Sequence, residues 1–297
     1  MSQLIRDAWL VAAYELAEVI RSKRLWVLML LYVGGAVLGA SLFIEALQSI
    51  EDTLAALGPE GQQGASVGLL ATPQAQELLS WYVGDPAVAA RLAVLPPLAL
   101  FYGWMALSFI PVLATVTGAE AVSADLASGA VRYVLLRIPP LHYSAGKLLG
   151  QYLLLLWGIL VGAAGVWLTG SMSMADFAPF DSAMWLVRLG LRASVYGFAF
   201  LGLALGVSHM CRSRSFARAY AFLALFTVSS LTWLTEWEPV RQRVWLRQFT
   251  EGVLPSSYRL DLWNPELSQR LPALLGLLVL GLGYCGLGYL YRVRRDW

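Results

Sequence analysis

The sequence predicts an all-α polytopic membrane protein, and three observations carry this prediction. Of the 297 residues, 58% are hydrophobic and only 13% are charged, whereas a soluble domain carries about 25% charged residues. The apolar residues gather into six runs, and a helix needs roughly 20 such residues to cross a bilayer. Three of these runs contain glycine pairs spaced by one helical turn, which is typical of helices that pack closely in lipid.

The six predicted spans are distributed along the whole chain. The first three and the last are long enough by themselves. The fourth needs residues 184–192 as an extension, and the fifth is short unless it includes Phe216. The apolar runs cover residues 25–44, 92–119, 148–175, 193–208, 219–235 and 271–291.

The first 22 residues predict an amphipathic elbow helix in the membrane interface. Apolar residues such as Leu4, Ala8 and Leu16 recur at spacings of three and four, while Asp7 and Glu18 fall on the other side. The alternative is a cytosolic helix packed on a partner. We expect no cleavable signal peptide, because charged residues interrupt this segment throughout.

Basic residues accumulate in cytoplasmic loops, and their distribution here gives an orientation. They precede the first span, occupy the loop between spans two and three, and follow spans four and six. Both termini are therefore expected in the cytoplasm of a bacterium, with the chain crossing the inner membrane several times. Residues 45–91 contain only one basic residue, Arg91, and are expected to form an external loop.

Residues 236–270 fit this alternation less well. They carry five arginines and five acidic residues, with Trp and Val interleaved among the arginines in "WEPVRQRVWLRQF". This composition favours external or re-entrant helices whose arginines extend to lipid headgroups. The alternative is that the number of spans differs from six.

The glycine pairs predict close helix contacts, either within one chain or between two chains. Small residues one turn apart allow the backbones of two helices to approach in lipid. The three pairs are Gly35 and Gly39, Gly158 and Gly162, and Gly202 and Gly206.

Residues 119–140 interrupt the apolar sequence with a charged segment that predicts a short cytosolic helix. Asp125, Gly129 and Arg132 fall on one stripe at helical spacing, and Pro139 with Pro140 ends the pattern. Two interpretations remain open from the residues alone. The helix rests on lipid headgroups, or it docks on a soluble partner.

The segment "GAEAVSADLASGAVRYVLLRIPPLHYSAGK" resembles the signature of ABC-2 type permeases, the membrane subunits of ATP-binding-cassette exporters. The matching places are Glu120, Asp125, Gly129, Arg132, Leu135, Leu136, Pro139, Gly146 and Lys147. His142 stands where the family usually has an arginine, and the turn before Gly146 is about two residues short. "LPSSYRLDLWNPEL" is similar to the family's NPxxxY region, with Leu254 in place of its first asparagine. Within the family, the chain most resembles permeases that serve nitrous-oxide reductase maturation.

This resemblance implies one transmembrane domain, residues 1–297, with the ABC-2 (type V exporter) fold. It implies that residues 119–140 are a coupling helix, and that two permease chains sit on two ABC ATPase subunits. ATP and Mg²⁺ would be bound by those subunits, with no cofactor in this chain. The residues that it assigns to ATPase coupling are Glu120, Asp125, Leu126, Gly129, Arg132, Tyr133, Leu136, Pro139 and His142.

Several other chemistries are not expected from the sequence. The phosphate-binding pattern GxxxxGK[ST] is missing, because Leu148 follows Gly146 and Lys147, so we do not expect this chain to hydrolyse ATP. A net charge of +2 gives no argument for nucleic acid. His142 and His209 are too few and too far apart in sequence to predict a metal site.

Three local patterns admit two interpretations each. Met172 and Met174 could hold Cu(I) or fill gaps at the interface. "ASGA", with Ser128, faintly resembles an intramembrane serine protease, but it lies in a polar cytosolic segment. Arg188 and Arg192, near the outer end of span four, could contact an anionic substrate or lipid headgroup. Alternatively they extend to the interface or pair with Asp176 or Asp181.

Two functions remain open at this point. The first is a permease subunit that couples a separate ATPase to export of an unidentified substrate. The second is a membrane anchor that transmits ATPase work to an external or periplasmic partner without moving a substrate, and it is motivated by the long loop at 45–91.

Overall fold

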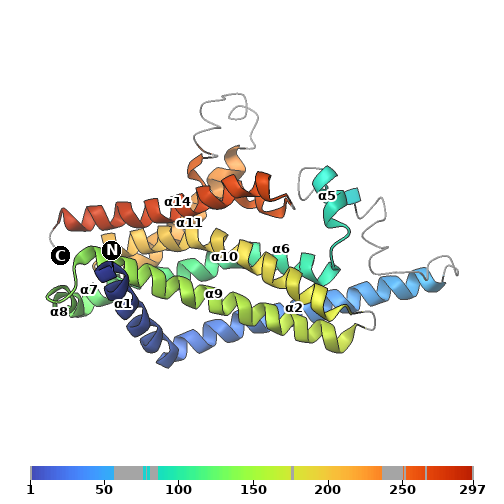
Figure 1. Ribbon diagram of the computed structural model, residues 1–297, viewed down its shortest axis with the longest axis horizontal. Helices are drawn as coiled ribbons and strands as arrows, with labels where there is room; N and C mark the ends of the chain where they lie inside the picture. Colours follow the sequence, from blue (N-terminus) through green and yellow to red (C-terminus); the bar gives the residue numbers. More distant parts are fainter. Residues whose placement is uncertain are drawn as a thin grey trace.

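The protein is a bundle of long helices, described by a computed structural model for residues 2–56, 76–77, 79–80, 86–174, 177–235, 250, 252–264 and 266–295 (Figure 1). Within these residues there is no strand, and six helices are long and apolar enough to cross a membrane. The prediction of an all-α polytopic protein with six spans is therefore confirmed. The six helices are α2 (Lys23–Ala56), α6 (Pro97–Gly118), α9 (Pro140–Ser173), α10 (Pro179–Met210), α11 (Arg214–Thr235) and α14 (Leu267–Val293).

Proline begins three of the spans. Pro97, Pro140 and Pro179 each occupy the first helical turn of α6, α9 and α10. A proline there costs no hydrogen bond, because the first amides of a helix have no partner within the helix. The fourth span includes the predicted extension at 184–192, so Arg188 and Arg192 lie within α10.

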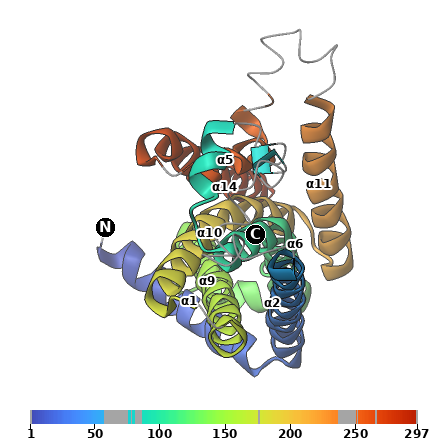
Figure 2. The ribbon, with the colours of Figure 1, turned by 90° about the vertical axis from the view of Figure 1, so that its right-hand side faces the viewer.

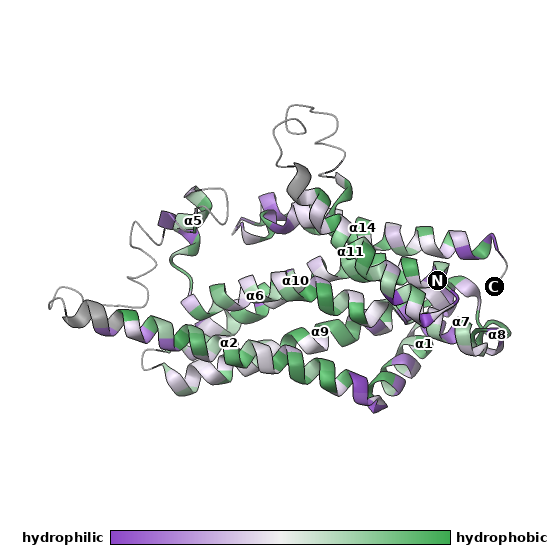
Figure 3. Ribbon diagram, turned by 180° about the vertical axis from the view of Figure 1, so that it is seen from behind, coloured by the Kyte–Doolittle hydropathy of each residue, from purple (hydrophilic) through white to green (hydrophobic). Residues whose placement is uncertain are grey.

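The centre of the bundle is α10. It packs against α6, α9, α11 and α14, and the end-on view shows it surrounded by α6, α9 and α14, with α11 at the edge (Figure 2). Most residues of α10 are buried, whereas α2, α11 and α14 leave broad apolar faces exposed (Figure 3). Apolar side chains such as Leu30, Leu31 and Phe226 are suited to face lipid there.

Glycines set the distance between α10 and α14. A Cβ atom on Gly202 would overlap the carbonyl oxygen of Gly281, and one on Gly206 would overlap the carbonyl oxygen of Tyr284. The backbones of the two helices are therefore in direct contact, and this contact lies within one chain. Gly288 of α14 faces Gly206 in the same way.

The other two glycine pairs differ from this one. A Cβ on Gly158 or Gly162 of α9 would lie 2.8 Å from Met29 or Tyr32 of α2, so here glycine accommodates side chains. A Cβ on Gly39 of α2 would lie 3.0 Å from the ring of Phe101. A Cβ on Gly35 would have no described atom of another residue within 4 Å. The predicted packing of Gly35 therefore has no partner among the described residues.

Helix α1 (Ser2–Arg21) covers the predicted elbow segment and crosses the end of the bundle against α9 (Figure 1). Ala8, Val11 and Ala12 are buried in this contact, next to Gly146 and Gly150 of α9. Its partner is thus another helix of the same chain. Apolar side chains remain on the outward side, among them Trp9 and Tyr14.

The prediction of one helix over 119–140 is wrong. Two short helices, α7 (Ser123–Ser128) and α8 (Ala130–Leu135), meet at Gly129, whose φ is +75°. Glycine adopts this left-handed conformation without the steric penalty that a Cβ imposes, so it ends α7 and turns the chain into α8. The amphipathic spacing of the segment did not reveal this break.

The predicted loop at 45–91 begins later than expected. Helix α2 continues to Ala56, because residues 45–56 include no proline or glycine that would end it. Helix α5 (Pro86–Leu92) packs Val88, Ala89 and Leu92 inward. Residues 57–75, 78 and 81–85 lie outside the described residues.

The predicted external or re-entrant helices at 236–270 are described only in part. Residues 236–249, 251 and 265 lie outside the described residues, and with them the tryptophan- and arginine-rich part. The following residues form two 3₁₀-helices, η2 (Pro255–Arg259) and η3 (Asp261–Trp263), and α14 then begins at Leu267. Leu254, Leu262 and Trp263 are buried, and a Cβ on Gly103 of α6 would lie 2.9 Å from the Trp263 ring. This stretch therefore enters the bundle.

The contact between α10 and α14 predicts an asymmetry between two glycine substitutions. Gly202→Ala should lower the free energy of unfolding by about 1–3 kcal/mol, because the methyl group overlaps the backbone of α14. Gly283→Ala, on the open side of α14, should leave it unchanged or raise it by up to about 1 kcal/mol. Unfolding in detergent micelles measures both, and equal stability of the two variants would contradict the close contact.

Candidate functional site

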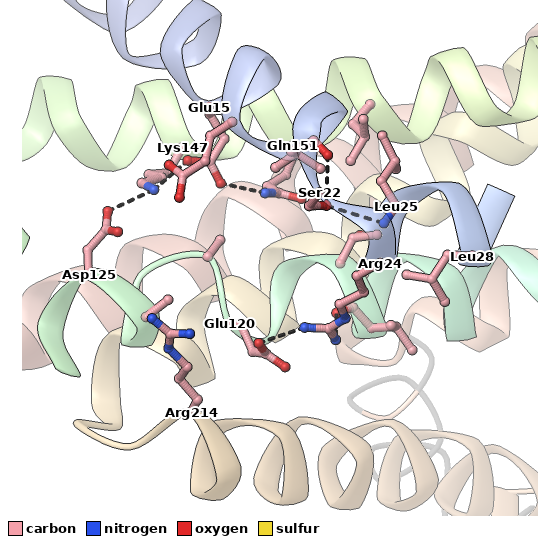
Figure 4. Close-up of a pocket in the computed structure, with 17 residues that line it drawn as sticks. Glu15, Ser22, Arg24, Leu25, Leu28, Glu120, Asp125, Lys147, Gln151 and Arg214 are labelled. Carbon is pink, nitrogen blue, oxygen red and sulfur yellow. Dashed lines mark hydrogen bonds and ion pairs between the residues drawn. The ribbon is translucent and has the colours of Figure 1, made fainter. Parts of the chain in front are cut away.

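A buried polar cluster lies where α1, α7 and α9 meet, at the end of the bundle that also holds both termini (Figure 1). At its centre, the Lys147 ammonium pairs with Glu15 of α1 and lies 2.8 Å from Asp125 of α7 (Figure 4). Tyr143 donates its O–H to Asp125 at 2.6 Å, and Gln151 donates to the second Glu15 oxygen at 2.7 Å. We call these five residues the Lys147 cluster.

The sequence of α9 explains this geometry. Tyr143, Lys147 and Gln151 follow one another at intervals of four, so they form one stripe of the helix. Gly146 and Gly150 lie beside this stripe, and a Cβ on Gly146 would lie 2.7 Å from the Ala8 carbonyl oxygen. Without side chains at these two positions, α1 comes close enough for Glu15 to reach Lys147.

Two of the three charges of the Lys147 cluster are deeply buried, and that of Asp125 is partly exposed. Lys147 is 4% exposed and Glu15 5% exposed. Charges in such surroundings are tolerated only when they are paired and hydrogen-bonded, since each loses its water. Each carboxylate of the cluster receives the ammonium and one further donor. The three elements that supply these groups are thereby tied together.

A second ionic contact lies at the end of α6. Glu120 forms ion pairs with Arg24 of α2 and with Arg218 of α11, both at 2.6 Å. Its side chain is largely buried, while the two arginines are about half exposed. Glu120 therefore links the start of α7 to two further spans.

Two more contacts hold this end of the bundle. The His142 ring lies 2.9 Å from Asp7, so the position where the family has an arginine here contacts α1. The amides of Val122 and Ser123 donate to the Ser208 hydroxyl at 3.1 and 3.0 Å. Ser208 of α10 thus caps the first turn of α7 from outside the helix, which satisfies two amides that would otherwise lack partners.

His209 of α10 lies inside the bundle beside these contacts. One ring nitrogen is 2.8 Å from the Leu205 carbonyl oxygen, to which it donates, and the other is 3.0 Å from the Ser144 hydroxyl of α9. The buried histidine thereby joins α9 to α10.

A cavity of about 240 Å³ opens between the Lys147 cluster and Glu120 (Figure 4). Its walls come from α1, α2, α6, α9 and α11 together with α7 and the turn before it. The charged groups that line it are Glu15, Glu18, Arg24, Glu120, Asp125, Lys147 and Arg214. The space lies beside the ion pairs that connect α7 to the rest of the bundle.

A family model described as "ABC-2 family transporter protein" matches residues 9–271, which is most of the chain. The chain belongs to the ABC-2 transporter family. A search of curated proteins found no match. Membership makes this ABC-2 protein the membrane component of an ABC transporter, and it implies an ABC ATPase as partner.

The residues assigned to ATPase coupling fall into two groups in this ABC-2 protein. Glu120, Asp125 and His142 are engaged inside the chain, as described above. Leu126 is partly buried against the core, and Gly129 makes the turn between α7 and α8. The remaining residues, on α8 and just after it, are exposed: Arg132, Tyr133, Leu136 and Pro139.

Sequence reasoning missed Glu15, Gln151 and Ser208. Glu15 had a detectable signal, since it follows Ala8, Val11 and Ala12 at helical spacing and so belongs to the buried face of α1. Gln151 follows Lys147 by one turn, which places both on one face of α9. Nothing in the sequence connects Ser208 with the amides of α7, because 85 residues separate it from Ser123.

Arg188 and Arg192 lie toward the other end of α10. Arg192 is buried and donates to the Leu262 carbonyl oxygen at 3.1 Å. The Arg188 guanidinium lies 5.1 Å from the centre of the Trp185 ring. Among the described residues, neither forms an ion pair with Asp181, and Asp176 lies outside them.

The other candidate chemistries gain no geometric support in the described part of this ABC-2 protein. No group of His, Cys, Asp or Glu there could hold a metal ion. Met172 is exposed, and Met174 packs against the core. Ser128 donates to the Asp125 carbonyl oxygen, while the two histidines contact other residues.

Removal of the central ammonium should destabilise the protein. Lys147→Met leaves two carboxylates in the cluster without their shared cation, so we expect unfolding in detergent to become easier by about 3–5 kcal/mol. Lys23→Met, at an exposed lysine of α2, serves as the matched control and should change stability by less than about 0.5 kcal/mol. The double variant Lys147→Met with Glu15→Gln should lose less than the sum of the two single losses. Additive losses would show that the two residues do not interact.

Proposed function

We propose that this protein is the permease subunit of an ABC exporter, and that it couples ATP hydrolysis by a separate ATPase to movement of a substrate. The observation that carries this proposal is the position of α7 and α8. They present an exposed surface at one end of the bundle. Ion pairs join α7 and the turn before it to α2, α9 and α11, and through Lys147 of α9 to α1.

The exposed residues of α8 suit a protein partner. Tyr133 is 77% exposed and Leu136 82% exposed, and the exposed arginines Arg132 and Arg137 lie beside them. Aromatic and apolar side chains with arginines around them are common at the centre of protein interfaces. A helix resting on headgroups could also expose these residues, and the binding experiment below separates the two.

Movement of α7 has a direct path into the spans. Asp125 holds Lys147 of α9, and Ser208 of α10 holds the first amides of α7. A displacement of α7 must either carry these helices with it or break buried polar contacts. ATP binding can shift the permease only through contacts that differ between its two states, and these contacts are candidates. The neighbouring cavity gives the charged side chains room to rearrange.

We further propose the assembly that this function requires. Two permease chains, identical or paralogous, sit on two ATPase subunits, which bind ATP and Mg²⁺. The complex lies in the inner membrane of a bacterium, with both termini in the cytoplasm. The common position of both termini and α8 at one end of the bundle supports this orientation (Figure 1). The finer resemblance suggests a cargo connected with nitrous-oxide reductase maturation, and membrane lipids surround the apolar faces.

The non-transporting anchor is distinguished from the exporter by reconstitution. An exporter in vesicles with its ATPase moves a defined compound when ATP is supplied. An anchor stimulates ATP hydrolysis only when its external partner is present and moves nothing.

The docking surface predicts a selective loss of ATPase binding. Tyr133→Glu with Leu136→Glu should reduce the co-purified ATPase by about tenfold or more, because central interface residues each contribute about 2 kcal/mol or more. Arg294→Glu, at an exposed residue near the end of α14, should retain it. Asp125→Asn should lower stability more than binding, since Asp125 faces inward. Unchanged binding by the double variant would contradict the docking role.

The orientation is tested by cysteine labelling. In a background of Cys211→Ser and Cys285→Ala, a cysteine at exposed Ala127 should react with an impermeant maleimide only in inside-out vesicles. A cysteine at Phe180, which is 74% exposed at the start of α10, should react only in right-side-out spheroplasts. The reverse pattern would invert the topology, and labelling of both from one side would overturn the number of spans between them.

A further inference from the structure

Three arginines gather at the end of the bundle opposite α7 and α8. Arg188 and Arg192 lie one turn apart on α10, and Arg270 lies in the first turn of α14. The close approach of α10 to α14 puts them within electrostatic range. Arg192 and Arg270 both donate to backbone carbonyls of the same short segment, those of Leu262 and Asn264, and Arg188 precedes Arg192 by one turn of α10.

Within the described part of the chain, no carboxylate neutralises these arginines. The ion pairs there involve none of the three. Glu266, at the start of α14, pairs with Arg91 instead, and the charge of Asp261 acts on Tyr258. The first turn of α14 holds no acidic residue, so its positive dipole end adds to the field.

Among the described residues, the hydrogen bonds of the three arginines leave most of their donors available. A guanidinium carries five N–H groups. In the described structure, Arg192 donates to the Leu262 carbonyl oxygen at 3.1 Å, and Arg270 donates to the Asn264 carbonyl oxygen at 3.3 Å. Arg188 lies over the Trp185 ring. These contacts hold the side chains in place without balancing their charge. A bound anion would accept the remaining N–H groups and also balance the charge.

The position of the cluster along the helices indicates the edge of the hydrocarbon layer. Arg270 and Arg292 lie 22 residues apart on α14, which is about 33 Å at 1.5 Å per residue. The hydrocarbon layer is about 30 Å thick, so these two arginines reach its two sides. Arg270 and its neighbours then lie at the depth of lipid headgroups, where Trp185 is also suited to lie.

We propose that Arg188, Arg192 and Arg270 form a binding site for one phosphate group, carried by the headgroup of an anionic phospholipid in the leaflet at this end. The planar guanidinium matches a phosphate in a bidentate manner, which a lysine does not reproduce. Arg192, buried and fixed to Leu262, forms the floor of the site. Arg188 and Arg270 are more exposed and close over the phosphate from α10 and α14.

Binding of short-chain lipids to the full chain in a neutral detergent tests this site. The probes are dioctanoyl phosphatidylglycerol, dioctanoyl phosphatidylcholine and inorganic phosphate, titrated by microscale thermophoresis. We expect the anionic lipid to bind most tightly. Its affinity should fall by about tenfold or more in Arg188→Gln with Arg270→Gln, since bonds between charged groups are the strong ones. The affinity of Arg188→Lys with Arg270→Lys for this lipid should lie between those of the unchanged protein and of the double glutamine variant.

The matched control is Arg294→Gln, which removes an exposed arginine at the other end of α14. It should bind the anionic lipid as the unchanged protein does. Arg192 is left intact, because its loss would disturb the segment around Leu262. Unchanged elution and thermal unfolding verify the fold of each variant, and the exposed single variant Arg188→Gln carries the test if the double variant aggregates.

Each outcome decides the proposal. The proposal is supported if the variants of Arg188 and Arg270 lose affinity for the anionic lipid while Arg294→Gln keeps it. If inorganic phosphate binds as tightly as the lipid and shows the same dependence on Arg188 and Arg270, the phosphate site stands and its source is a soluble anion. Equal lipid binding by the double glutamine variant, or an equal loss in Arg294→Gln, overturns it.

Discussion

A single buried ammonium holds the end of this bundle together. Lys147 cannot leave its place between Glu15 and Asp125 without depriving two carboxylates of their shared cation, one of them deeply buried, which is a costly state. Three segments that are distant in sequence therefore behave as one unit at this point. The exposed surface of α8 is connected to the spans through α7, which is anchored in this way.

The bundle uses a different kind of contact at each level. Ion pairs and a serine cap act at the α7–α8 end, and backbone contacts between glycines act in the middle of α10 and α14. At the other end, arginines bond to backbone carbonyls of the segment that enters between the helices. Only the middle level avoids charge entirely, which suits the part of the protein that lies deepest in lipid.

The sequence predicted what depends on periodicity and composition. The six spans, the extension of the fourth span through Arg188, and the segment 119–140 as a distinct element all follow from local patterns. It did not predict the break at Gly129, because a glycine at a helical position is compatible with either a continuous helix or a left-handed turn. Periodicity places Glu15 on the buried face of α1, but a single sequence contains no record of which distant residues Glu15 and Ser208 contact. The inward position of Asp125 follows from the same contacts.

The contact between α10 and α14 also constrains the order in which the protein can assemble. The ribosome delivers α10 to the membrane well before α14, which is the last of the six spans described here. Until α14 is inserted, Gly202 and Gly206 lack the backbone that they contact in the folded bundle. The packing around α10, the central helix, is thus completed only when α14 arrives. A chain truncated before residue 267 therefore lacks one wall of its own core.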